Sequence, residues 1–79
     1  MKVNVYVTLK QGVLDPQGKA VGHALDTLGF KNVANVRIGK LIELEIAAKN
    51  KTQAKEEVKE MCEKLLANTV IESYQFEIE

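Results

Sequence analysis

The chain is poor in the residues from which covalent, metal and catalytic centres are built. Its 79 residues include one cysteine, one histidine, one proline and no tryptophan. A single cysteine excludes an internal disulfide, and a zinc site would depend on carboxylates. Basic and acidic residues number 11 each, so no net field favours nucleic acid or an anionic membrane. With no apolar run long enough to span a membrane, an intracellular, soluble protein is predicted.

Apolar patterning fills the chain and predicts one α+β domain over residues 1–79. Residues 2–9 alternate apolar and polar side chains, as a strand with one buried face does. Residues 53–67 carry an apolar stripe at helical spacing, with Asn50 or Thr52 as the N-cap. A closing strand is predicted over residues 70–78.

The first helix has both of its ends specified by residue type. Asp15 is a good N-cap acceptor, and Pro16 follows at the first helical position, where its missing N–H costs nothing. Gly29 sits where a left-handed residue ends a helix. Gly18 and Gly22 share a face and each costs about 1 kcal/mol against alanine, so we expect a close backbone neighbour there.

The segment between the helices carries apolar residues at even positions from 34 to 48, and only Lys40 interrupts the row. A two-residue hairpin at Gly39–Lys40 suits a type II′ turn, but it would place apolar residues opposite polar ones. One continuous strand keeps the apolar residues on one side, so parity favours the long strand. If the protein is monomeric in solution, the exchanged version is wrong and the closed hairpin is the better interpretation.

A strand over residues 34–48 far exceeds the usual length of about five or six residues, so its halves need different partners. We predict a dimer with Gly39 and Lys40 as an open hinge. In it the first strand, first helix and first half of the long strand meet the second half, second helix and last strand of another copy. The predicted fold class is α+β: a β-α-β-α-β chain with one long central strand, ferredoxin-like units completed by strand exchange, and two helices on one face of an antiparallel sheet.

No group of residues predicts a catalytic, cofactor-binding or metal site. The stretch from Gly12 to Lys19 is similar to a phosphate loop, but it has one residue too many between its glycines and Ala20 where Ser or Thr is needed. His23 lacks a triad partner, and Cys62 lies on the apolar stripe of the second helix, where a buried inert thiol is expected.

Partner contact is predicted instead, on residues expected to be exposed around the first helix and the hinge. These candidates are Lys10, Gln11, Asp15, Gln17, His23, Arg37 and Lys40. Glutamates 43, 45, 77 and 79 form the outward rows of strands, which is typical of a solubilising face. The residues alone predict a small interaction or regulatory module, and they do not separate a scaffold from a ligand sensor.

Three stretches together resemble the PurS family, the small subunit of phosphoribosylformylglycinamidine synthase. They are VTLKQGVLDPQGKAVGHALDTLGF from Val7, VRIGKLIEL from Val36 and CEKLLANTVIESY from Cys62. The resemblance covers essentially the whole chain. One departure is Thr69, which follows Asn68 where the family usually has proline.

The resemblance implies a non-catalytic assembly subunit in the fourth step of de novo purine biosynthesis, within an ATP- and glutamine-dependent C–N ligase complex. It implies a homodimer or a tetramer of two dimers that bridges a PurL-like synthetase subunit and a PurQ-like glutaminase subunit and supports ammonia transfer between them. ATP and Mg²⁺ then belong to the synthetase, with no cofactor, nucleic acid or membrane bound by this chain, and the location is cytoplasmic. The alternatives are a small-molecule-sensing regulatory domain of ferredoxin-like type and a free-standing thiol enzyme built on Cys62.

Overall fold

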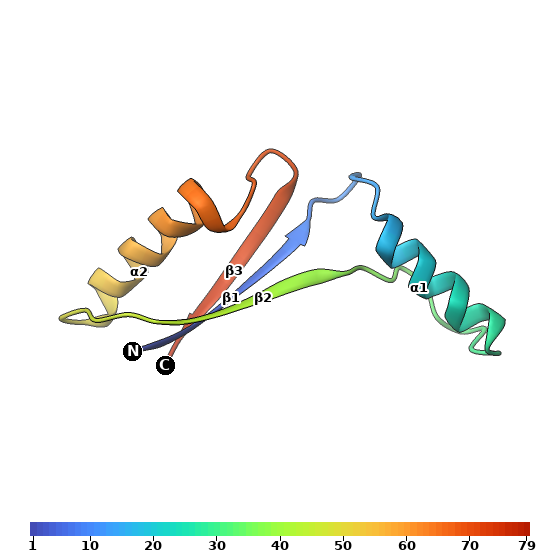
Figure 1. The fold of residues 1–79 in the computed structure, drawn as a ribbon, viewed down its shortest axis with the longest axis horizontal. Helices are drawn as coiled ribbons and strands as arrows, with labels where there is room; N and C mark the ends of the chain where they lie inside the picture. The colour runs from blue at the N-terminus through green and yellow to red at the C-terminus, as the bar shows by residue number, and fades with distance from the viewer.

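The computed structural model describes residues 1–79 as a three-stranded antiparallel sheet with two helices (Figure 1). In chain order the elements are β1 (Lys2–Leu9), α1 (Pro16–Thr27), β2 (Gly39–Glu45), α2 (Lys51–Met61), a π-helical turn η1 (Cys62–Leu66) and β3 (Glu72–Ile78). The α+β class is confirmed. The second helix begins slightly earlier than predicted, capped by the Asn50 side chain, which accepts a hydrogen bond from the Gln53 amide at 2.9 Å.

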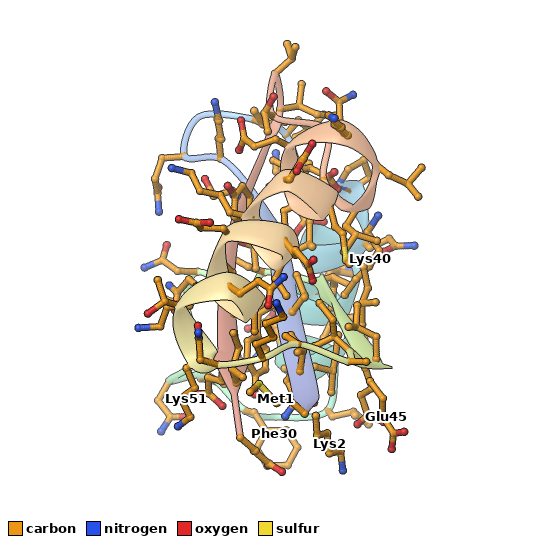
Figure 2. All side chains as sticks on the ribbon, turned by 90° about the vertical axis from the view of Figure 1, so that its left-hand side faces the viewer. Met1, Lys2, Phe30, Lys40, Glu45 and Lys51 are labelled. Atoms are coloured by element: carbon orange, nitrogen blue, oxygen red, sulfur yellow. The ribbon has the colours of Figure 1, made fainter.

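The sheet has the strand order β2-β1-β3, with β1 between its two neighbours. Val5 of β1 lies opposite Ile42 of β2 and Phe76 of β3, so apolar residues of all three strands share one face. Both chain termini lie at the same end of this sheet (Figure 1). Lys2 pairs with Glu45 there, and Figure 2 shows both near Met1.

The helix α2 covers the apolar face of the sheet and completes the core (Figure 1). The buried cluster consists of Val3, Val5, Val7, Val58, Cys62 and Ala67. Beyond Cys62 the π-helical turn carries Leu66 against this cluster, whereas Leu65 is 82 % exposed. The apolar stripe therefore shifts by one residue at η1, because a π turn is wider than an α turn. We call β1, β2, β3, α2 and η1 together the body.

The helix α1 has the ends that its sequence predicts. The Asp15 carboxylate accepts a hydrogen bond from the Gly18 amide at 2.9 Å, and Pro16 opens the helix. At the other end Gly29 has a φ of 101°, and the Phe30 and Gly29 amides donate to the Leu25 and Asp26 carbonyls. This pair of bonds is a Schellman motif.

The two glycines of α1 have the close neighbour that was expected, and that neighbour is Val36. A Cβ added to Gly18 would collide with the Val36 carbonyl oxygen, and one added to Gly22 would lie 3.6 Å from a Val36 methyl. Residues 33–37 thus run alongside α1. We call residues 16–38, which include α1 and this segment, the arm.

The arm does not cover the sheet of its own chain. It lies beyond the end of the sheet (Figure 1), and no residue of α1 belongs to the core cluster or packs against it. The molecule measures 51 × 25 × 14 Å, with a radius of gyration of 15.9 Å, against about 12 Å for a compact domain of this length. Within one chain, therefore, only α2 lies on the sheet.

The predicted long strand forms only in part. β2 covers Gly39–Glu45, whereas residues 33–38 have no ladder partner, and Asn35 has a φ of 58°. The closed hairpin does not form either, since the chain runs from residues 33–38 into β2 without reversing (Figure 1). Gly39 pairs with Thr8, and a Cβ there would lie 2.6 Å from the Val7 carbonyl, so this glycine permits close packing rather than a tight turn.

The division of the chain also differs from the predicted one. β1 pairs with both β2 and β3 of its own chain, because all three present apolar side chains to α2 in matching register. The first strand therefore stays with the second half of the chain. The segment left without a sheet is the arm.

Candidate assembly interface

The arm joins the body through two chain segments that lie side by side, residues 9–15 and 37–39. We call them the neck, which shares residues 37 and 38 with the arm and residues 9 and 39 with the body. Asp15 connects them. Its Oδ1 accepts from the Gly18 amide at 2.9 Å, and its Oδ2 accepts from the Ile38 amide at 2.8 Å. One carboxylate thus caps α1 and ties the start of α1 to the entry of β2.

Arg37 ties the same two segments from the opposite direction. Its Nη2 donates to the Leu9 and Lys10 carbonyls at 3.1 and 3.2 Å, and its Nε lies 3.9 Å from Asp15 Oδ2. The Lys10 amide in turn donates to the carbonyl of Ile71, the residue before β3, at 2.8 Å. The neck is therefore cross-tied to itself and to the sheet.

The electrostatics of the neck favour an ionised Asp15. The amides of Ile38 and Gly18 donate to its carboxylate and hold its pKa below the usual range, and the nearby Arg37 acts in the same direction. The residue is only 6 % exposed. A charge at this depth persists because both of its oxygens accept hydrogen bonds.

The arm encloses an open groove of about 930 Å³ between α1, the loop before it and residues 33–37. Of the predicted contact residues, Gln11, Asp15, His23 and Arg37 line this groove. A smaller hollow on the neck, of about 380 Å³, is lined by Gln17 and Lys40, with Lys40 Nζ lying 3.6 Å from Glu72. Lys10 contributes its carbonyl to the neck. The candidates therefore gather around the neck, and partner contact by them stays a prediction.

The most exposed apolar side chains of the arm were not among those candidates. Leu28 is 73 % exposed and Phe30 is 55 % exposed, and Val21 and Val33 are exposed too. The helical spacing of Val21 and Leu28 is the signal that could have identified those two residues, but a helical stripe by itself predicts burial within the same chain. Only the position of α1 shows that the stripe has no cover.

The outer edge of β2 offers unpaired backbone groups. Met1 and Ile46 exchange both of their backbone hydrogen bonds, at 2.8 and 2.9 Å, which sets the phase of the β1–β2 ladder. Hydrogen-bonded pairs therefore fall on even positions of β2, and the amides and carbonyls of Leu41, Glu43 and Glu45 point outward. Such an edge is a template for another strand.

The remaining sites of possible chemistry lie apart from the neck. Cys62 is fully buried, and burial followed by the charge of Glu63 raises the pKa of its thiol, as expected for an inert cysteine. The open face of the sheet carries the predicted glutamates, and the Tyr6 hydroxyl donates to Glu77 at 3.4 Å. No three His, Cys, Asp or Glu side chains gather as metal ligands would, and no helix has the length and apolarity of a membrane span.

A packed body, a tethered arm with an uncovered apolar face and an open strand edge are the features of a small assembly module. Comparison with known proteins agrees. The family model of PurS, phosphoribosylformylglycinamidine (FGAM) synthase, matches residues 2–79, and the chain belongs to this family.

The following relatives and solved structures are matched over most of their own length. The FGAM synthase subunit PurS of Bacillus subtilis is 59 % identical over 99 % of this chain and 92 % of its own, and that of Methanocaldococcus jannaschii is 46 % identical over 99 % and 94 %. The solved structure of B. subtilis PurS superposes with a TM-score of 0.85 over 99 % of this chain and 96 % of the other. A chain of PurLQS from Thermotoga maritima gives 0.89 at 38 % identity, over 96 % and 93 %.

Proposed function

We propose that this protein is the non-catalytic assembly subunit of an FGAM synthase, bridging a PurL-like synthetase and a PurQ-like glutaminase in the cytoplasm so that ammonia passes between them. The observation that carries the proposal is the arm, whose apolar face and groove have no cover within the chain. The similarity to a chain of PurLQS from T. maritima supports it. ATP and Mg²⁺ are bound by the synthetase.

We further propose that the arm is covered by a second copy of this chain. The sheet order β2-β1-β3 leaves β2 at an edge. In a four-stranded ferredoxin-like sheet the remaining strand, the one that follows the first helix, lies at this edge. Residues 33–38 of the partner copy fit that place, running antiparallel to β2 around a two-fold axis near Gly39. The partner's α1 then lies beside α2 on the apolar face.

Side-chain parity supports this pairing. A register that sets even positions against even positions brings Val36 or Ile38 opposite Ile42, and all of these face the helices. The outward backbone groups of Leu41, Glu43 and Glu45 gain partners in the same step. The exchanged unit is thus the arm, between two hinges at its neck.

The surface area is of the size that such a dimer requires. The chain exposes 5925 Å², about 1,100 Å² more than a compact protein of its mass. A standard interface buries about 800 Å² on each partner. A second copy seated on the arm and the β2 edge accounts for the excess.

Glu43→Pro tests the pairing, because the Glu43 amide points away from β1 and proline removes only that outward donor. We expect the body to fold normally, and the dimer to dissociate at micromolar concentration in sedimentation velocity. Glu43→Ala is the matched control, since it removes the charge and keeps the amide. A dimer unaffected by proline would refute pairing at this edge.

The assembly role is tested by mixing purified subunits. We expect glutamine-dependent turnover to require this chain, whereas turnover with ammonia proceeds on the synthetase alone. Full glutamine-dependent turnover in its absence would sink the proposal. Calorimetry of the isolated chain with purine nucleotides and amino acids addresses the sensing alternative, since a scaffold binds none of them.

A further inference from the structure

We infer that Asp15 is a positioning residue that, with Arg37, sets the direction of the arm relative to the body and so determines whether the arm reaches a second copy. The inference rests on the proposed exchange dimer. It concerns what orients the arm, a question that the existence of a dimer leaves open.

The hydrogen bonds of Asp15 exceed what an N-cap needs. A cap requires one acceptor for an amide of the first turn, which Oδ1 supplies to Gly18. The second oxygen accepts from Ile38, which lies 23 positions further along the chain and immediately before β2. That second bond belongs neither to the helix nor to the sheet ladder, and it links the start of α1 to the residue before β2.

Arg37 closes the opposite side of the same junction. Its two hydrogen bonds end on consecutive carbonyls, Leu9 and Lys10, where β1 gives way to the loop before α1. The arm can bend at the two neck segments, residues 9–15 and 37–39, and the side chains of Asp15 and Arg37 each tie one segment to the other. Rotation at either segment therefore breaks the hydrogen bonds of Asp15 to Ile38 and of Arg37 to Leu9 and Lys10.

Close packing inside the arm makes it move as one unit. Gly18, the residue that Asp15 caps, lies against the Val36 carbonyl, one residue before Arg37. The arm therefore turns as a whole about the neck, and the hydrogen bonds of Asp15 and Arg37 oppose that turn. A rigid direction is what an exchanged arm requires, because a swinging arm loses entropy on every docking event.

Asp15→Asn separates the two roles, since asparagine caps helices as well as aspartate does. Its amide offers one oxygen to Gly18, and its NH₂ group faces the Ile38 amide, donor against donor. The matched control is Asp26→Asn, the same change on an exposed aspartate of the same helix, which pairs only with Lys31 at 3.2 Å. Arg37→Gln removes the opposite tie.

The experiment measures the dimer dissociation constant by sedimentation, the radius of gyration by X-ray scattering and the alkylation rate of Cys62. Cys62 is the only thiol and lies in the body, so slow alkylation reports an intact body whatever the arm does. We expect Asp15→Asn to raise the dimer dissociation constant at least tenfold and to change the radius of gyration of the protein, while Cys62 is still alkylated slowly. Asp26→Asn should match the parent protein.

Each outcome decides between the claims. A monomeric parent protein refutes the proposed dimer, whereas a dimeric parent with an unchanged Asp15→Asn dimer refutes the role of Asp15 alone. If Cys62 is alkylated rapidly in Asp15→Asn, the body of that variant is unfolded, and Arg37→Gln decides the question instead. An Arg37→Gln dimer as tight and as extended as the parent would then overturn the inference.

Discussion

The body and the arm of this protein have equally regular sequence patterns, yet they bury their apolar side chains to different extents. In the body, α2 and three strands bury Val3, Val5 and Val58 completely. In the arm, α1 has a correct cap, a correct stop and an apolar stripe, and Leu28 is still largely exposed. The comparison teaches that a well-formed helix is no sign of a complete core. Stability within one chain resides in the body, and the capacity to associate resides in the arm.

The largest effect that tests this comparison is expected in the body. Val5→Asp places a carboxylate at a fully buried position between β2 and β3, where no donor awaits it. We expect a loss of about 4 kcal/mol or more, enough to unfold a domain of this size. Circular dichroism and rapid Cys62 alkylation measure it. A folded Val5→Asp protein would show that the core is not where the structure places it.

The corresponding change in the arm should leave the chain folded and weaken association. Leu28→Lys removes an exposed apolar side chain and adds a positive charge at the C-terminal end of α1, where the helix dipole favours it. We expect unchanged thermal unfolding of the monomer and at least a tenfold weaker dimer by sedimentation. The control is Leu65→Lys, an equally exposed leucine on the body, which should dimerise normally.

The two glycines of α1 should respond in opposite directions. Gly18→Ala forces a methyl group against the Val36 carbonyl and to 2.8 Å from Asp15 Oδ2, which we expect to cost about 1–3 kcal/mol. Gly22→Ala meets a methyl at an ordinary 3.6 Å and should gain up to about 1 kcal/mol from helix propensity. Denaturant unfolding of both variants measures the difference. Equal effects would show that α1 does not pack on Val36 in solution.

The smallest expected effect concerns a tyrosine of the body. The Tyr74 hydroxyl donates to Glu63 Oε2 at 2.6 Å, and this bond, followed by burial, raises the pKa of Tyr74 from 10.0 to about 12. Because the pKa of Tyr74 is raised in the folded state, the neutral tyrosine stabilises the fold at every pH below the pKa of the unfolded chain. This contribution is lost as the pH rises from 10 towards 12. Glu63→Gln should return the Tyr74 pKa towards 10.0 in an ultraviolet absorbance titration. Tyr74→Phe identifies which transition in the titration belongs to Tyr74. A Tyr74 transition that does not shift in Glu63→Gln would contradict the hydrogen bond.

Local features of the chain could be predicted from residue types because they depend on near neighbours. Asp15 and Asn50 cap their helices as expected, and Gly29 ends α1 in a left-handed conformation. The alternation of β1 placed its valines in the core, and the stripe predicted over residues 53–67 placed Cys62 there. The close neighbour required by Gly18 was predicted as well, although its identity was not.

The candidate site was less predictable, because its geometry joins segments that are distant in the chain. Nothing in the pattern around Asp15 indicates that its second oxygen accepts from Ile38, or that Arg37 reaches Leu9. The even-position row predicts one long strand, and that prediction is wrong for residues 33–38, because parity shows which face a residue occupies and not whether a neighbouring strand exists. Residues 33–38 keep the parity and lack the ladder.

By itself the sequence determined the helix caps, the first strand, the buried valine face and the resemblance to the PurS family, because these depend on local periodicity, capping and motif identity. The tertiary structure alone decided which strand pairs with which, and that α1 lies away from its own sheet. Those choices depend on register, packing and one carboxylate shared between two distant amides. They made a few unremarkable apolar residues of α1 into an uncovered surface, and Asp15 from a simple helix cap into the junction that orients it.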